Sequence, residues 1–331
     1  MTAPATLTLV TAAFGHRPFA TCEAGRHGIS IDRLQRAHRA GRLRRLARGV
    51  YVVPDAAGAD SWHLAQVRAA ALRRQGVPCV IGGGAAALRW EVPMLGQSPM
   101  APAILVPTSS DVRTGMRGGI RHLHEDLHPD DVRPSPPDDV VTSPVRTAID
   151  LIRHARLGGR FAVATMSIAQ RRQWEQFASP EPGQLRSQLA DPQVRSALAT
   201  GALDALARAP RPGTAYVSRI LSRCDPRLES VLEAVAWYDF IEAGLPLPAP
   251  QAWVRGASRR WYCVDFLWEE GRVIGEADGA VKYAAAADVM AEKARQADLE
   301  AAGYRFVRWI WADAMGERSY VPRVARALGD R

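Results

Sequence analysis

The sequence has almost no lysine. Of its 43 basic residues only Lys282 and Lys293 are lysine, and all the others are arginine. Arginine thus fills basic positions by default, so one explanation of the net charge of +9 is a solvated arginine-rich surface without a ligand. The same bias makes the two lysines informative, because lysine is a compact ammonium group with a tunable pKa. Chemistry that needs a proton shuttle or a point charge beside a phosphate would retain them.

Cysteine pairs, long apolar runs and nucleotide motifs are also lacking. The four cysteines form no C-x-x-C and no metal-binding spacing, so we expect reduced thiols in the cytoplasm. No apolar run reaches about 18 residues, which argues against a membrane-spanning helix. The start, from Ala3 to Phe14, follows no basic residue, so we expect a helix there and not a signal peptide. Gly82–Gly84 completes no nucleotide-binding motif, which favours a tight turn over a phosphate site.

Most of the excess positive charge lies in residues 1–54. This segment holds nine arginines and two acidic residues, whereas residues 215–331 hold 16 basic and 17 acidic residues. Helices are predicted at 7–14, 20–26 and 31–40, and two short strands around a turn at 47–49 follow them. A helix-turn-helix followed by a basic hairpin is typical of a winged helix that binds DNA.

The third predicted helix separates an apolar face from a basic one. Ile31, Leu34 and Ala37 stand at helical spacing and are predicted to face the core. The arginines of the helix are then directed toward a major groove, and those of the hairpin toward the DNA backbone. The candidate DNA-binding residues are Arg33, Arg36 and Arg39 in the helix and Arg42, Arg44, Arg45 and Arg48 in the hairpin.

The segment Arg48-Gly-Val-Tyr-Val-Val53, placed after these helices, resembles a strand of the amino-terminal domain of AbiEi-type antitoxins. The resemblance implies a winged helix that binds promoter DNA and represses its own operon. A cognate toxin is then a candidate partner, and the sequence leaves open whether one exists.

Residues 55–213 are predicted to form an α/β domain with no assigned chemistry. His122, His124 and His128 lie near Glu125 and Asp126, and His-x-His places two imidazoles on one face of a strand. This pattern is compatible with a metal pair, but a half-exposed strand end before a proline-rich loop is the favoured explanation. We expect this domain to act as a scaffold or an interaction surface.

Two carboxylates are predicted to oppose each other near the end of the chain. A turn at 269–272 pairs Trp268 with Val273 and sets Asp265 across from Glu276, with Asp278 on the face of Glu276. Like charges so placed repel, and Mg²⁺ or Mn²⁺ would resolve the repulsion. Glu229, on a helix predicted at 228–243, is expected to aim at the same point. The alternative is an ion pair with Arg272 or a nearby arginine.

Residues 228–313 resemble the PD-(D/E)XK nuclease fold, in a branch similar to very-short-patch-repair endonucleases. The resemblance rests on Glu229, Leu245-Pro246 with Pro250-Gln251, Asp265-Phe-Leu-Trp268, Glu276-Ala-Asp-Gly279 and Gly303-Tyr-Arg-Phe-Val-Arg-Trp309. It implies Asp265 and Glu276 as metal ligands with Glu229 in support. Asp278 stands at the usual lysine position, so Lys282, or Lys293 from the next helix, would supply the ammonium group. Gln251, Arg295 and Arg308 are expected to position DNA phosphates.

The sequence therefore predicts a multidomain α+β or α/β protein. Its parts are a winged helix-turn-helix domain (1–54), an AbiEi-like α/β middle domain (55–213) and a restriction-endonuclease-like mixed sheet flanked by helices (214–331). The leading hypothesis is a DNA-binding protein with a magnesium-dependent endonuclease-like domain whose candidate catalytic residues are Asp265, Glu276, Lys282, Asp278 and Glu229. The alternatives are a non-catalytic AbiEi-like antitoxin or repressor with a degenerate nuclease fold, and a plain interaction scaffold.

Overall fold

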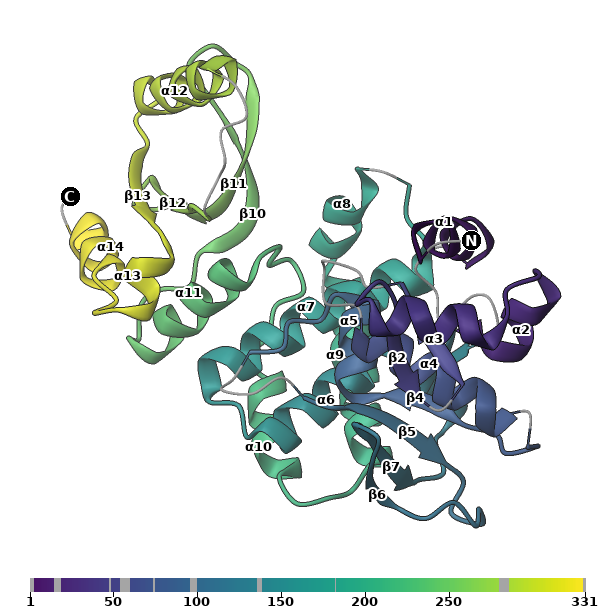
Figure 1. Ribbon diagram of the computed structural model, residues 1–331. Coiled ribbons are helices and arrows are strands. Elements are labelled where there is room, and N and C mark those ends of the chain that lie inside the picture. The colour runs from purple at the N-terminus through teal and green to yellow at the C-terminus, as the bar shows by residue number, and fades with distance from the viewer. Residues whose placement is uncertain are drawn as a thin grey trace. The chain divides into compact units, whose positions relative to one another are not determined.

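The computed structural model divides into two compact units, Met1–Ala155 and Arg156–Arg331. It describes residues 3–14, 19–47, 49–53, 60–73, 75–95, 100–135, 139–181, 183–279 and 286–329. Arg48 and Lys282 lie outside the described residues. Among the helices that are described, none combines the length and the apolar character needed to cross a membrane. Figure 1 labels most of the elements of each unit.

The first unit begins with helices and a small antiparallel sheet in the strand order β1-β3-β2. Strands β2 and β3 pair as a hairpin with a register shift between Arg45 and Ala47. The helices and the two strands of the hairpin stand where the sequence predicts them. The elements are α1 (Ala3–Phe14), β1 (Phe19–Ala20), α2 (Thr21–Arg26), α3 (Ile31–Arg39), β2 (Arg44–Ala47) and β3 (Val50–Val52).

The core beneath α3 corrects one prediction. Leu34 and Ala37 are fully buried, as expected, but Ile31 is 53% exposed. Ile31 is the first residue of the helix, after the N-cap Ser30. It lies about 120° around the helix axis from Ala37, at the edge of the buried stripe. Leu43, just beyond the helix, completes the core instead.

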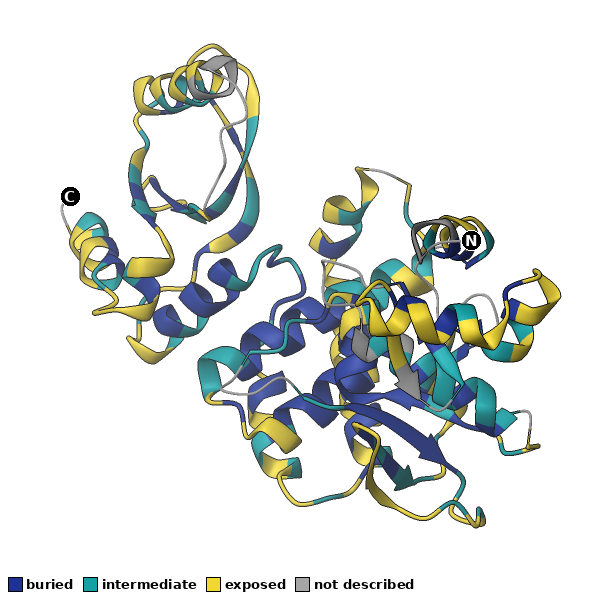
Figure 2. Ribbon diagram, in the orientation of Figure 1, coloured by how far each residue is buried: buried dark blue, intermediate teal, exposed yellow. Residues whose placement is uncertain are grey.

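A six-stranded mixed sheet forms the rest of the first unit, in the order β6-β7-β5-β4-β9-β8. The central strand β5 is buried along its whole length, as Figure 2 shows. Helix α6 begins with Pro144 after Ser143, as predicted. The elements are α4 (Asp60–Arg73), β4 (Val80–Gly82), α5 (Gly83–Trp90), β5 (Pro102–Val106), β6 (Gly115–Arg117), β7 (Ile120–His124), a 3₁₀ turn (Pro129–Asp131), β8 (Val132–Ser135), β9 (Asp139–Thr142) and α6 (Pro144–Ala155).

The glycines between β4 and α5 are explained by close backbone packing. A Cβ on Gly84 would lie 1.9 Å from the carbonyl oxygen of Met100, and Gly83 has a φ of +62°. The backbone N–H of Gly84 donates to the carbonyl of Ala101 at 3.1 Å. These contacts account for the glycine run without a bound phosphate.

The second unit joins a helical part to a four-stranded sheet in the order β10-β11-β12-β13. The first three strands are antiparallel, and β12 and β13 are parallel, with α12 as the crossover between them. The elements are α7 (Gly159–Ala178), α8 (Gln184–Ala190), α9 (Pro192–Arg208), α10 (Thr214–Leu221), α11 (Val231–Glu242), β10 (Ala249–Arg255), β11 (Trp261–Trp268), β12 (Val273–Ala277), α12 (Ala286–Ala301), β13 (Arg305–Trp309), α13 (Trp311–Met315) and α14 (Tyr320–Gly329).

An aromatic core fixes this sheet against α11 and α14. Phe240 of α11 meets Phe266, Trp268, Trp309 and Tyr320 edge-on, at centroid distances of 5.1–6.0 Å. Such edge-to-face contacts are favourable beyond the area they bury. Helix α12 covers the sheet from the other side (Figure 1). The polar residues described next lie between these two packed layers and so are held on a rigid support.

Candidate nucleic-acid surface and carboxylate site

A row of polar residues crosses the sheet of the second unit. Trp268 pairs with Val273, which confirms the predicted turn, and the pairing continues to Phe266 and Gly275. The same register, continued by one residue, sets Asp265 opposite Glu276. Glu276 is itself the partner of Arg308 on β13. The strands thus bring the two predicted carboxylates together and set a cation beside them.

Gln251 extends this row to the edge strand β10. The pairs on either side of it, Pro250 with Phe266 and Ala252 with Val264, place Gln251 opposite Asp265. Its φ of 52° is unusual for a residue other than glycine. The thiol of Cys263 donates to its Oε1 at 3.5 Å. The local backbone therefore turns the Gln251 amide toward the carboxylates.

Asp265 is held by the backbone of the neighbouring strand. Its Oδ2 accepts a hydrogen bond from the Ala277 N–H at 2.8 Å. Burial raises the pKa of Asp265, and the negative charges of Asp278 and Glu229 act in the same direction. The Ala277 hydrogen bond and the charge of Arg295 oppose this rise. An aspartate in such a position is costly to ionise without a nearby cation.

Glu276 forms an ion pair with Arg295 of α12. The Nη2 of Arg295 donates to Glu276 Oε1 at 2.8 Å and to the Cys263 carbonyl at 2.9 Å. Burial, followed by repulsion from Asp265, raises the pKa of Glu276 to about 7. The ion-pair alternative from the sequence is thus present, through Arg295. Arg272 instead donates to the carbonyls of Ala302 and Gly303.

Arg308 belongs to the same network of ion pairs. Its Nη2 donates to Glu292 Oε1 at 2.6 Å, and its Nη1 lies 3.4 Å from Asp278 Oδ2. Glu292 also pairs with Arg295 at 3.1 Å. Arg295 and Arg308, which the sequence predicts to contact DNA phosphates, are therefore both bound to carboxylates of the same unit.

Glu233 is a member of the site that the sequence analysis missed. It lies on α11, and its Oε2 accepts hydrogen bonds from Gln251 Nε2 at 2.9 Å and from the Glu229 N–H at 3.0 Å. Burial and then the charge of Asp265 raise its pKa to about 7. The sequence signal was Ser230-Val-Leu-Glu233, because Ser-x-x-Glu marks a helix start. Ser230 Oγ indeed accepts from the Glu233 N–H at 3.1 Å.

Glu229 lies before α11, so the prediction that it stands on that helix is wrong. The helix begins at Val231 after the N-cap Ser230. Glu229 is clamped by Arg171 Nη2 at 2.7 Å and by Arg186 Nε and Nη2 at 2.8 and 2.6 Å. Burial would raise its pKa, but these arginines outweigh burial and lower it. The Glu229 carboxylate therefore forms ion pairs with these two arginines.

The metal prediction does not fit the arrangement of the described side chains. Within the described part of the chain, no three His, Cys, Asp or Glu side chains are grouped so that they could hold one ion. Arg295 donates a hydrogen bond to Glu276 Oε1, an oxygen that a metal ion would need as a ligand. His122 and His124 have separate partners, Arg68 at 2.9 Å and the Val112 carbonyl at 2.6 Å. Lys293 is exposed on α12.

The first unit carries a different polar surface, built from the arginines of α3 and β2. Arg36, Arg39, Arg42, Arg44 and Arg45 are exposed, and Arg33 is half-buried. The contacts of the α3 arginines include backbone carbonyls, since Arg33 donates to Gly28 at 3.4 Å and Arg36 to Asp32 at 3.3 Å. Acidic residues are scarce in this segment, so the surface retains its positive charge.

Comparison with known proteins assigns the class of this amino-terminal segment. Residues 9–54 match a family model described as "Transcriptional regulator, AbiEi antitoxin". The match spans α3 and the hairpin with their exposed arginines. It ends before the six-stranded sheet and carries no information on the carboxylate row.

Two curated relatives come from Mycobacterium tuberculosis: the uncharacterized protein MT2308 of strain CDC 1551 / Oshkosh and the uncharacterized protein Rv2248 of strain ATCC 25618 / H37Rv. Each is 31% identical over 119 residues, which is 36% of this chain and 44% of the relative. The chain therefore spans less than half the length of the curated relatives it matches.

Proposed function

We propose that the protein is a cytoplasmic DNA-binding transcriptional regulator of the AbiEi antitoxin kind. The observation that carries the proposal is the family match over residues 9–54, the segment in which exposed arginines gather on α3 and β2. In this proposal the segment is a winged helix. Helix α3 enters a major groove, the β2–β3 hairpin contacts the DNA backbone, and a cognate toxin is the protein partner.

The arginine surface supplies affinity mainly through phosphates. Each phosphate that an arginine neutralises releases condensed counterions, so binding weakens steeply as salt rises. Guanidinium groups also bind phosphate in a bidentate way, which fixes the orientation of the protein on the duplex. The nine arginines and two acidic residues of 1–54 fit this role.

The test is a binding titration with duplex DNA from the region upstream of the protein's own gene, at several salt concentrations. A variant with Arg36→Ala and Arg39→Ala should bind more weakly and with a smaller salt slope. Arg223→Ala is the matched control, because Arg223 is in the second unit and pairs with Glu242 on the surface. Equal affinity of the double variant and the wild type would refute the proposal.

A second candidate function is metal-dependent hydrolysis of DNA by the second unit, which would require Glu276 to exchange Arg295 for a metal ion. The observation in its favour is the group of three carboxylates, Glu233, Asp265 and Glu276, whose pKa values are all raised by burial, and for Glu233 and Glu276 also by the charge of Asp265. Proteins rarely retain such a group without a use, and it is typical of catalytic sites. Mg²⁺ or Mn²⁺ as cofactor, and roles for Lys282 and Asp278, belong to this candidate alone.

Incubation of the protein with supercoiled and linear DNA in Mg²⁺, Mn²⁺ or EDTA tests this candidate. Nicking that requires metal and is lost in Asp265→Asn would support it. Asp298→Asn is the control, since Asp298 is a half-buried carboxylate away from the row, and it accepts from Ser258 and Tyr262. Absence of cleavage with DNA binding retained would favour the regulator with a degenerate nuclease fold.

A further inference from the structure

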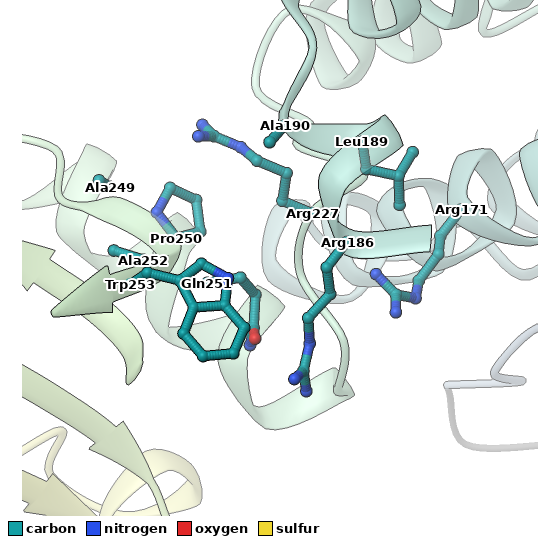
Figure 3. A pocket seen from close by; sticks show the side chains of 10 residues that line it. All are labelled: Arg171, Arg186, Leu189, Ala190, Arg227, Ala249, Pro250, Gln251, Ala252 and Trp253. Atoms are coloured by element: carbon teal, nitrogen blue, oxygen red, sulfur yellow. The ribbon is translucent and has the colours of Figure 1, made fainter. Parts of the chain in front are cut away.

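A cavity of about 230 Å³ lies among α7, α8, β10 and the segment before α11. Three arginines line it: Arg171 of α7, Arg186 of α8 and Arg227. Figure 3 shows Pro250, Gln251 and Trp253 of β10 on one side, with Arg171 and Leu189 on the other. The cavity shares Gln251 with the carboxylate row, but its three arginines belong neither to that row nor to the arginine surface on α3.

The arginines around the cavity could accept an anion, because one of their donor groups has no partner in the described part of the chain. Arg171 and Arg186 both bind the single carboxylate of Glu229, and Nε of Arg171 also lies 3.8 Å from Oε1 of Glu175. The Nη1 of Arg171 is buried and has no hydrogen-bond partner among the described residues. A buried donor without a partner is costly, and an incoming acceptor would relieve that cost.

Glu229 shows the kind of group that these arginines hold. Arg186 binds its two oxygens through Nε and Nη2 at 2.8 and 2.6 Å, while Arg171 binds one of them at 2.7 Å. This forked geometry is also the one by which arginine binds a phosphate. Glu229 thus occupies the position of an anionic ligand.

Trp253 gives the cavity an aromatic wall. Its side chain is 57% exposed although it lies in a sheet, and it stands two residues from Gln251 on the same side of β10. An exposed indole beside arginines is the combination that stacks an unpaired base while cations hold the backbone. A duplex keeps its bases stacked, so the chemistry favours a single strand.

We propose that this cavity binds one nucleotide of single-stranded DNA. Its phosphate replaces Glu229 between Arg171 and Arg186, and its base stacks on Trp253. Glu229 is then an internal competitor that sets the affinity of the site. The proposal does not rest on the regulator function, because the residues concerned lie outside the segment that matches the family model.

The test is the binding of a fluorescent oligothymidylate to the full-length chain carrying Arg36→Ala and Arg39→Ala, which weakens binding by the first unit. In this background Arg186→Ala and Trp253→Ala should each lower affinity about ten-fold. Trp253→Phe should bind nearly as the parent, and Glu229→Gln should bind more tightly. Arg223→Ala removes the same charge away from the cavity and should change affinity less than about two-fold.

Competition distinguishes the sources of the phosphate. Thymidine monophosphate should displace the oligonucleotide at lower concentration than inorganic phosphate does, because only the nucleotide offers a base to Trp253. Equal competition by the two, or equal affinity of Arg186→Ala, Trp253→Ala and Arg223→Ala, would overturn the proposal. Arg186 and Trp253 are both substantially exposed, so these variants should keep the fold, which thermal unfolding will verify. Duplex binding by the unmodified first unit is a separate readout, which keeps the two proposals distinguishable.

Discussion

The arginines of α3 and β2 differ in their surroundings from those of the second unit. On α3 and β2 of the first unit they are exposed in a segment that has only two acidic residues among nine arginines. In the second unit Arg171, Arg186, Arg295 and Arg308 each bind a carboxylate, and residues 156–331 hold 24 basic and 21 acidic groups. The first arrangement has few acidic residues near it in the sequence, whereas the arginines named in the second unit pair with carboxylates around the sheet.

The comparison shows that residue type alone does not report function in an arginine-rich chain. A guanidinium with a carboxylate within about 3 Å has little field left to attract a distant phosphate. The number of acidic neighbours therefore separates the α3 arginines, which we propose to bind DNA directly, from the second-unit arginines that already hold a carboxylate. Arg171 and Arg186 would bind a phosphate only by exchanging it for Glu229. The following predictions test that separation, beginning with the largest expected effect.

Stability of the second unit should fall as pH rises. The pKa values of Glu233 and Glu276 are raised from an ordinary value of 4.5 to about 7, so the folded state binds more protons than the unfolded state between these pH values. The free energy of unfolding must then decrease from about pH 5 to pH 7. Glu233→Gln should remove about 3 kcal/mol of this dependence. Urea unfolding at several pH values will measure it, and an unchanged pH profile would contradict the burial argument.

Loss of exposed arginines in the first unit should reduce DNA affinity strongly. For Arg36→Ala with Arg39→Ala we expect about a hundred-fold weaker binding at low salt, since each charge-assisted contact contributes roughly 1.5 kcal/mol. The slope of log affinity against log salt should fall by about 0.9 for each lost phosphate contact. Anisotropy titrations with duplex DNA give both quantities. A lower affinity with an unaltered salt slope would argue against phosphate contacts by these residues.

Loss of a paired arginine in the second unit should reduce stability. Arg295→Ala leaves Glu276 buried beside Asp265 without its cation, which we expect to cost about 2 kcal/mol at pH 8. Chemical denaturation measures this, and the double variant Arg295→Ala with Glu276→Gln should recover most of the loss. If the single and double variants are equally unstable, Arg295 contributes through packing alone.

The smallest effect is expected for an arginine pair on the surface of the second unit. Arg223 and Glu242 are partly exposed, and such pairs contribute less than about 1 kcal/mol. Arg223→Ala should therefore leave thermal unfolding, salt dependence and DNA affinity almost unchanged. A large change in any of these quantities would contradict the conclusion that exposed and paired arginines have different roles.

Local patterns predicted the strands of the second unit well. The short turn at 269–272 fixes the register of β11 against β12, and short runs of mostly apolar residues mark both strands. This is why the neighbouring positions of Asp265 and Glu276 followed from the sequence. The pairing of Glu276 with Arg295 did not, because it depends on how α12 packs across the sheet.

The positions of the remaining site residues could not be predicted from the periodicity of apolar residues. Glu229 precedes α11 and Glu233 lies in its first turn. Only the N-cap at Ser230 decides which of the two faces Gln251. Arg171 and Arg186 come from helices distant in sequence, in a region to which the sequence assigned no chemistry. Contacts over such separations arise from tertiary packing, which overrides local preference.

The left-handed backbone of Gln251 also protects the molecule from its own sheet. Strand β10 forms one edge of the sheet, and an exposed edge is a template on which a strand of another chain can add. The conformation at Gln251 interrupts the ladder in the middle of β10 and divides the strand into two short stretches. Neither stretch offers a long flat run of free amides, so the tryptophan-bearing edge is a poor starting point for aggregation.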